Sequence, residues 1–280
     1  MKLISFRHGA NSGYGILGDK GIIDAGRKLR DHADLASVLA TPEKLTALAG
    51  DPPDFALADV ELLPPITRPR IICIGLNYKS HIAEMGRDTP GYPILFTRYP
   101  ESVVASGQAL VRPRLSEKFD YEGELAFVIG KPGRHVDHAT ALDHVAGYSC
   151  FNDGSIRDYQ FHTSQFVAGK NFERSGGFGP WIVTSDEVGD VGSLKLFTRL
   201  NGKVMQEARL DDLLFGVADL IAYISQVFTL LPGDVIATGT TGGVGAAQKP
   251  PLWMRPGDRI EVEIERIGTL SNPVIAEEGA

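Results

Sequence analysis

Three acidic residues at alternate positions open the stretch with the clearest chemical potential. Asp120, Glu122 and Glu124 lead into the apolar residues 125–129, which end at Gly130 and predict a buried strand. Side chains two residues apart in a strand share a face, about 6.5–7 Å from each other. Carboxylates crowded there repel unless a proton or a cation lies between them. The pattern indicates either a solvated strand edge or a site for a hard cation such as Mg²⁺, Mn²⁺ or Ca²⁺.

His81 and Glu84 form a second candidate pair. They follow the predicted strand 71–75 and, being three residues apart, share one face of a short helix. A carboxylate that accepts a hydrogen bond from an imidazole fixes the tautomer of the ring and makes it a better base. The spacing therefore indicates a general base, and an ordinary exposed His/Glu pair is the alternative interpretation.

Asp153 lies where the predicted strand 143–151 gives way to a helix. Arg157 and Gln160 follow four and seven residues later, so all three can line one helical face. Asp153 could simply cap that helix. A carboxylate, a guanidinium and an amide on one face are also the groups that would hold an anionic ligand beside a metal.

The glycine-rich segment 238–245 is a candidate anion-binding loop. It lacks the Gly-Lys-Ser/Thr ending of a P-loop and the spacing of a dinucleotide site. Backbone N–H groups and a free Thr240 hydroxyl are expected to take a carboxylate there. His135, His138 and His144 cluster in sequence, but no cysteine or fourth ligand completes a zinc pattern, and a surface position is expected.

Composition restricts the class of protein. The 280 residues carry a net charge of −7, which argues against a nucleic-acid or anionic-membrane partner. The apolar run 71–76 is too short to span a bilayer, and the first eight residues do not form a secretory signal. Cys73 and Cys150 make no disulfide framework, so a cytoplasmic location is expected.

The surrounding elements predict a strand-rich chain in two parts. Short strands with glycine turns fill residues 1–30, and short helices follow at 35–39 and 42–48. Five prolines between residues 50 and 69 interrupt regular structure and place a boundary near residue 66. We therefore predict a small N-terminal domain, 1–65, and a main domain, 66–280. In the main domain, strands are expected at 181–184 and 259–265, a hairpin around Asn201-Gly202, and a core helix at 215–228.

Taken in order, these residues resemble the fumarylacetoacetate hydrolase superfamily over roughly residues 70–275. The resemblance rests on an ordered set of short motifs: Gly75-Leu76-Asn77-Tyr78, His81-x-x-Glu84, Tyr121-Glu122-Gly123-Glu124, Asn152-Asp153, Arg157-Asp158-x-Gln160, Gly169-Lys170, Gly179-Pro180-Trp181, Pro232-Gly233-Asp234 and Thr238-Gly239-Thr240. It implies an α+β, β-rich fold, in which a mixed β-roll catalytic domain follows a small N-terminal α+β domain, and a homodimer. It also implies Mg²⁺ or Mn²⁺ held by Glu122, Glu124 and Asp153. Gly154 and Thr241 depart from the usual pattern beside the site and bear on the shape of the pocket.

The resemblance implies a small 2-oxo or 2,4-diketo acid substrate. It assigns catalysis to His81, Glu84 and Lys170, and substrate binding to Arg157, Gln160, Thr240 and Tyr78. The expected reaction is hydrolysis of the C–C bond of an acylpyruvate, such as maleyl-, fumaryl- or acetylpyruvate, to pyruvate and a carboxylic acid, in aromatic or sugar-acid catabolism. Because His81 and Glu84 are both present, hydrolysis is favoured over a decarboxylase, hydratase or isomerase acting on a related 2-oxo acid such as oxaloacetate. A binding protein without turnover has no need of this pair.

Overall fold

The computed structural model describes residues 1–84 and 88–279, apart from the side chains of His81, Ala83 and Glu84. The N-terminal part contains β1 (Lys2–His8), β2 (Asn11–Gly18), β3 (Gly21–Asp24), α1 (Ala25–Lys28), α2 (Leu35–Val38), α3 (Pro42–Leu48), η1 (Leu57–Asp59) and β4 (Glu61–Leu63). The chain then continues through β5 (Ile71–Gly75), α4 (Lys79–Glu84), β6 (Ile94–Arg98), η2 (Pro100–Ser102), β7 (Val103–Val104), β8 (Leu110–Arg112), β9 (Phe119–Asp120), β10 (Gly123–Ile129) and η3 (His138–His144).

The remaining elements complete the main body. They are β11 (Val145–Asn152), β12 (Ser155–Ile156), α5 (Arg157–Gln160), α6 (Val167–Lys170), β13 (Gly176–Thr184), α7 (Ser185–Val188), η4 (Val191–Ser193), β14 (Lys195–Leu200), β15 (Lys203–Arg209), η5 (Leu210–Asp212), α8 (Val217–Val227), β16 (Val235–Thr240), η6 (Gly245–Ala247), β17 (Arg259–Ile264) and β18 (Gly268–Ala276). No helix within the described ranges is long and apolar enough to cross a membrane.

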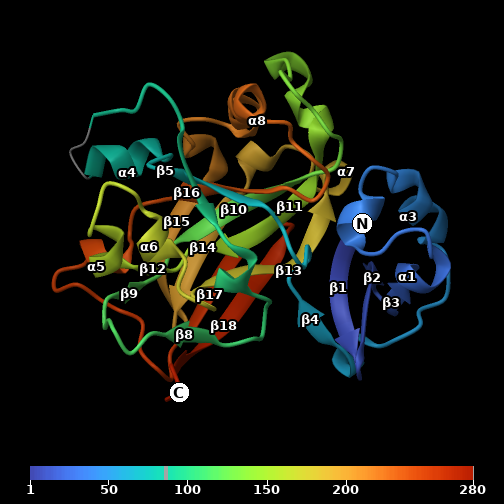
Figure 1. Ribbon diagram of the computed structural model, residues 1–280, viewed down its shortest axis with the longest axis horizontal. Helices are drawn as coiled ribbons and strands as arrows, with labels where there is room; N and C mark the ends of the chain where they lie inside the picture. Colours follow the sequence, from blue (N-terminus) through green and yellow to red (C-terminus); the bar gives the residue numbers. More distant parts are fainter. Residues whose placement is uncertain (85–87, 280) are drawn as a thin grey trace.

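A large mixed sheet forms the centre of the molecule (Figure 1). Its strand order is β3-β2-β1-β13-β11-β10-β16-β5-β6, with β4 beside β1 and β7 beside β13. Most neighbours are antiparallel, whereas β16 pairs in parallel with β5, and β7 with β13. A second sheet, in the order β15-β14-β17-β18-β8, packs against the first. The mixed, strand-rich architecture confirms the predicted fold class.

Strand β10 lies at the centre of the core and is buried along its whole length. Its side chains alternate between two apolar clusters, as the pleat of a strand requires. Leu125 and Phe127 join the cluster that includes the second sheet and α8, whereas Ala126 and Val128 join the cluster on the opposite face. A strand buried on both faces reads as a continuous apolar run, which is the pattern seen in the sequence.

The N-terminal elements extend the same large sheet rather than forming one of their own. Strand β1 pairs with β13 through Lys2↔Val183 and Leu3↔Ile182, and lies to the side of the main body in Figure 1. Leu3 and Leu45 share an apolar cluster with Ile71. The division near residue 66 stays a prediction.

The start of β10 is flanked by the ends of two strands that are distant in sequence. Gly123 pairs with Asn152 at the end of β11, and Glu124 pairs with Thr240 at the end of β16. The loops that leave these two strands therefore open beside the first residues of β10. This topology brings residues from three parts of the chain together at the ends of three neighbouring central strands, β11, β10 and β16.

Two predicted elements differ locally from the structure. The strand expected at 143–151 begins at Val145, because residues 138–144 form a 3₁₀ helix whose first turn is capped by Asp137. The acidic stretch does not run as one strand, since β9 ends at Asp120 and β10 begins at Gly123. The interruption decides where the three carboxylates point.

Candidate active site and metal centre

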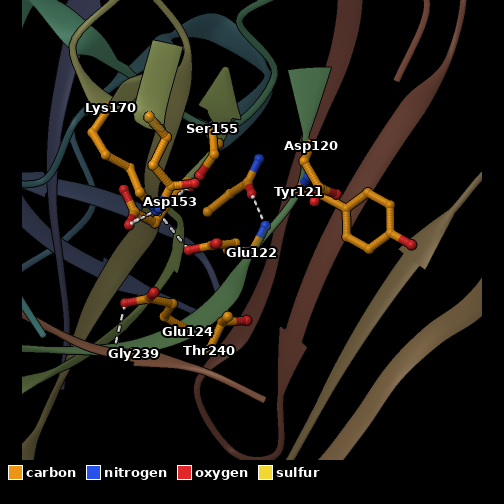
Figure 2. A network of polar contacts seen from close by, with 12 residues as sticks. Asp120, Tyr121, Glu122, Glu124, Asp153, Ser155, Lys170, Gly239 and Thr240 are labelled. Atoms are coloured by element: carbon orange, nitrogen blue, oxygen red, sulfur yellow. Dashed lines mark hydrogen bonds and ion pairs between the residues drawn. The ribbon is translucent and has the colours of Figure 1, made fainter. Parts of the chain in front are cut away.

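Three carboxylates meet where β10 begins and β11 ends, and they belong to Glu122, Glu124 and Asp153. One oxygen from each lies within 4.8 Å of the others, and all three residues are buried. Figure 2 shows the three side chains converging from the β10 segment and from the loop after β11. The structure therefore brings together the three residues that the resemblance assigns to a metal.

Backbone contacts fix the separation between Glu122 and Asp153. The Asp153 N–H donates to the Glu122 carbonyl (2.8 Å), and the Glu122 N–H donates to Oδ1 of Asn152 (3.0 Å). Gly123 permits this close approach to the second sheet, since a Cβ there would lie 1.9 Å from the Thr198 hydroxyl. The metal-site strand is thus held from both sides.

Three buried cations surround the carboxylates. Lys170 Nζ lies 2.7 Å from Glu122 Oε2 and 2.5 Å from Asp153 Oδ2. Arg157 Nη1 lies 2.6 Å from Glu122 Oε1, and Arg98 Nη1 lies 2.6 Å from Asp153 Oδ1. Both oxygens of Glu122 and of Asp153 therefore contact a cation.

Glu124 differs from its two neighbours. Its Oε2 accepts a hydrogen bond from the backbone N–H of Gly239 (2.9 Å), and no cation contacts it among the residues that the structure describes. Burial and the nearby charges of Asp153 and Glu122 raise the pKa of Glu124 well above its ordinary value. The charged form of Glu124 is therefore the least compensated of the three carboxylates by the described residues, and a bound cation would favour it.

The charges of the cluster fit a metal cation. Four buried carboxylates, with Asp120 the fourth, meet three buried cations. Each carboxylate oxygen has a second lone pair, so the existing contacts leave capacity for coordination. Three carboxylates are a donor set for a hard cation such as Mg²⁺ or Mn²⁺. The residues present fit such an ion.

The opposite shifts of two groups follow from their contacts. Burial alone would raise the pKa of Glu122, but the ion pairs with Lys170 and Arg157 outweigh burial and lower it. Burial alone would lower the pKa of Lys170, but Asp153 and Glu122 outweigh burial and raise it. Lys170 is therefore an ammonium, a holder and donor of a proton rather than a free base.

Asp120 does not join the triad, contrary to the expectation of three carboxylates on one face. Figure 2 shows it beside Tyr121, on the far side of Glu122. Its Oδ2 lies 2.7 Å from Nε of Arg157. The cause is the break between β9 and β10, which ends the alternation before Glu122.

A cavity of about 200 Å³ opens onto this cluster. Glu122, Arg157, Gln160 and Lys170 form its polar end. The rest of its wall is largely apolar and includes Phe96, Leu76, Phe161, Phe166, Val244 and Ala246. Phe96 also lies beneath the Lys170 ammonium, 5.3 Å from Nζ to the ring centroid. The cavity has the concave, mostly apolar form with a few convergent polar groups that suits a small ligand.

The expectation of a free Thr240 hydroxyl is wrong. Its Oγ1 donates to the Gly123 carbonyl (2.9 Å) and accepts from Gln206 Nε2 (2.8 Å), so its one proton is already used. Thr240 does line the cavity, and its contact with substrate stays a prediction.

The remaining predicted site residues are Tyr78 and the pair His81 and Glu84. Tyr78 is fully buried in the hydrophobic core and does not appear in the cavity wall among the described residues, and its contact with substrate stays a prediction. His81 and Glu84 lie in α4 as expected, but their side chains are outside the description. Their pairing stays a prediction.

Sequence reasoning missed Arg98 and Gln206. Arg98 ends the largely apolar strand β6, of which it is the one buried residue, and a buried charged side chain requires a partner. Gln206 is the one buried residue of β15, between the half-buried Met205 and the exposed Glu207. Their partners, Asp153 and Thr240, are distant in sequence and emerge only from the fold.

Residues 70–275 match the family model for the C-terminal domain of fumarylacetoacetate hydrolase, which covers most of the chain. The chain belongs to the fumarylacetoacetate hydrolase family. The protein is thus an enzyme of this family. Gly154, which departs from the family's usual pattern, is explained by crowding, because a Cβ there would lie 2.0 Å from the Ser175 carbonyl oxygen.

Several family members resemble the chain over most of its length. The human mitochondrial oxaloacetate tautomerase FAHD2A is 40% identical over 232 residues, 82% of this chain and 74% of the relative. The oxaloacetate tautomerase YisK of Bacillus subtilis (strain 168) is 41% identical over 225 residues, 79% of this chain and 75% of the relative. The maleylpyruvate hydrolase of Sphingobium sp. SYK-6, solved with a manganese(II) ion and pyruvate, superimposes with a TM-score of 0.81, at 28% identity and with 99% and 100% coverage of the two chains.

Proposed function

We propose that the protein is a metal-dependent tautomerase that interconverts the keto and enol forms of a 2-oxo acid, with oxaloacetate as the substrate to test. The observation that carries the proposal is the Lys170 ammonium between Glu122 and Asp153, at the polar end of the cavity. The proposal belongs to the isomerase alternative of the sequence analysis. It is supported by two oxaloacetate tautomerases at 40% and 41% identity.

Tautomerisation needs an acid near one atom and a base near another. The C3–H bond breaks, its electron pair forms the C2=C3 double bond, and the carbonyl π pair takes a proton at the C2 oxygen. Lys170 holds a proton at Nζ in a buried position and is assigned to the C2 oxygen. His81, paired with Glu84, is the candidate base for the C3 proton.

Arg157 and Gln160 are assigned to the substrate's C1 carboxylate. Arg157 donates from Nη1 to Gln160 Oε1 (2.9 Å), which leaves the Gln160 amide N–H₂ as a donor. Nη2 of Arg157 has no protein partner in the described part of the chain, and both side chains line the cavity. Two donors on one wall match the two oxygens of a carboxylate.

Glu122, Glu124 and Asp153 would hold the Mg²⁺ or Mn²⁺ that the family implies. When bound, such an ion would act as a Lewis acid that polarises the 2-keto group and stabilises negative charge on its oxygen. The apolar wall of Phe96, Phe166 and Val244 would limit the access of water to the reacting carbons. Exclusion of water favours proton transfer over attack by water.

Hydrolysis of an acylpyruvate is the second candidate. It is favoured by the overall superposition on a maleylpyruvate hydrolase and by the presence of His81 and Glu84, which hydrolysis would use to activate water. Both reactions share an enolate-forming end of the cavity, so the fold does not separate them.

A product-resolved assay separates the two candidates. Metal-stripped protein is resupplied with Mn²⁺ and offered oxaloacetate and several acylpyruvates, and the enol, pyruvate, organic acid and CO₂ are quantified. Faster keto–enol exchange of oxaloacetate without release of pyruvate or CO₂ supports the tautomerase. Stoichiometric pyruvate and acid from an acylpyruvate, with no effect on oxaloacetate, would contradict it and establish the hydrolase.

A further inference from the structure

We propose that Asp120 is a positioning residue that ties the loop 241–247 to Arg157. Through this tie it would fix both one wall of the cavity and the guanidinium assigned to the substrate's carboxylate. The inference rests on the proposed function, because that function gives Arg157 its role. Asp120 is the one residue of the acidic stretch 120–124 whose carboxylate the triad does not use.

The Asp120 carboxylate is fully buried and accepts four hydrogen bonds. Oδ1 accepts from the N–H of Tyr121 (2.9 Å) and of Gly245 (2.7 Å). Oδ2 accepts from the N–H of Ala246 (2.9 Å) and from Nε of Arg157 (2.7 Å). Each oxygen thus binds one donor of the loop and one donor from another part of the site.

The loop is built to approach this carboxylate closely. A Cβ on Gly245 would lie 2.6 Å from Asp120 Oδ1 and 2.0 Å from the Leu252 carbonyl oxygen, so the position requires glycine. The neighbouring side chains Val244, Ala246 and Ala247 line the cavity. The position of Asp120 therefore determines where this wall lies.

The same carboxylate orients Arg157. With Nε held by Asp120 and Nη1 held by Glu122 and Gln160, the guanidinium plane is fixed at two edges. Its remaining amino group, Nη2, is then the one available to a ligand in the cavity. A guanidinium recognises a carboxylate through its planar geometry, so a rotation of the plane weakens binding without removing the charge.

An amide cannot replace this carboxylate. Four donors converge on two oxygens, and in Asp120→Asn one oxygen becomes an N–H₂ group that faces donors. Whichever way the amide turns, either Arg157 with Ala246 or Tyr121 with Gly245 loses its acceptor. Because Asp120 is not a member of the triad, metal binding itself is expected to persist.

The test is a double-mutant cycle in which the binding of oxalate, a probe of 2-oxo-acid binding, is measured. Affinities for Mn²⁺, and for oxalate in saturating Mn²⁺, are measured by calorimetry for wild type, Asp120→Asn, Arg157→Met and the double variant. We expect Asp120→Asn to weaken oxalate binding about 10-fold or more, the size typical of supporting residues, with little change for Mn²⁺. In the Arg157→Met background the same substitution should cost clearly less than in wild type, because only its effect through the loop 241–247 remains. Additive losses, or an equal loss of Mn²⁺ affinity, would overturn the proposal.

Hydrogen exchange gives a readout independent of metal and turnover. The amides of Gly245 and Ala246 should exchange faster in Asp120→Asn than in wild type, and unchanged protection would contradict the tie. If Asp120→Asn does not fold, Ala246→Pro removes one loop donor, at a 3₁₀ position whose φ suits proline. This substitution should weaken oxalate binding and speed hydrogen exchange at the Gly245 amide. Wild-type oxalate affinity together with a wild-type exchange rate would overturn the proposal. Because these readouts need no catalysis, failure of the tautomerase assignment leaves them interpretable.

Discussion

Arg98 and Asp153 form an ion pair in which both side chains are completely buried, with Nη1 of Arg98 2.6 Å from Oδ1 of Asp153. Arg98 also donates to the Gly154 carbonyl (3.0 Å) and to the hydroxyls of Ser102 (3.1 Å) and Ser175 (2.7 Å). The guanidinium therefore fixes Oδ1 of Asp153, while Oδ2 contacts Lys170. The orientation of a proposed metal ligand depends on a residue from β6.

Replacing Arg98 should reduce both stability and metal affinity. Arg98→Met strands the buried Asp153 charge, which we expect to cost about 3–5 kcal/mol of unfolding free energy. Loss of a residue that orients a ligand should weaken Mn²⁺ binding about 10–100-fold. Chemical denaturation measures the unfolding free energy and calorimetry measures the Mn²⁺ affinity. Arg98→Lys keeps the positive charge but loses the planar set of guanidinium donors, so both of its values should lie between those of wild type and Arg98→Met. Unchanged Mn²⁺ affinity in folded Arg98→Met would contradict this role.

Glu124 and Glu122 should respond differently to the same change. Glu124→Gln replaces a buried carboxyl group that no described cation contacts with a neutral amide, and it keeps an acceptor for the Gly239 N–H. Its metal-free stability should lie within about 1 kcal/mol of wild type or above it, while Mn²⁺ binding is lost. Glu122→Gln breaks pairs with Lys170 and Arg157 and should cost about 3–5 kcal/mol. Equal destabilisation by the two substitutions, measured without metal near neutral pH, would refute the difference in charge compensation.

Lys170 should be needed for turnover more than for metal binding. Lys170→Met removes the proposed proton donor, and loss of a general acid costs about 100-fold or more in rate. It also removes a positive charge 2.5 Å from Asp153, so Mn²⁺ affinity should be unchanged or higher. Lys203→Met, at an exposed position, is the matched control and should change neither. A loss of Mn²⁺ affinity that accounts for the whole loss of rate would place Lys170 in metal binding instead.

Gln206 clamps the metal-site strand to the loop after β16. It accepts from the Gly123 N–H (2.9 Å) and donates to Thr240 Oγ1 (2.8 Å) and the Thr241 carbonyl (2.9 Å). Gln206→Leu leaves a buried N–H unsatisfied and should lower the unfolding free energy by about 2–3 kcal/mol. The neighbouring exposed Glu207→Gln should change it by less than about 1 kcal/mol, since a surface ion pair contributes little. Denaturant titration decides, and equal effects of the two substitutions would disprove the clamp.

The alternation of residues along the chain predicted much of the fold. Strand 71–75 and helix 42–48 have the expected bounds, because their apolar spacing and terminal residues are local signals. The break between Asp120 and Gly123 was not predictable in this way. It depends on pairing with β11 and β12 and on the contact of Gly123 with Thr198, which are distant in sequence.

The site could be predicted in part for the same reason. The resemblance named the three carboxylates, and the fold brings them together. Whether a hydroxyl is free, as for Thr240, or an aromatic side chain lines a cavity, as for Tyr78, depends on partners that only the tertiary structure supplies. Arg98 and Gln206 act through such partners. The homodimer and the choice between Mg²⁺ and Mn²⁺ stay predictions.

The most direct test is the rate at which the enol form of oxaloacetate converts to the keto form, followed by the decay of its ultraviolet absorbance. Wild type with Mn²⁺ is compared with metal-stripped wild type, with Glu124→Gln in the same Mn²⁺ and with Mn²⁺ alone. A metal-dependent tautomerase should accelerate the decay in the first sample only, without release of pyruvate. Acceleration that survives complete removal of metal, or that persists in Glu124→Gln, would contradict a metal-dependent reaction at this carboxylate triad.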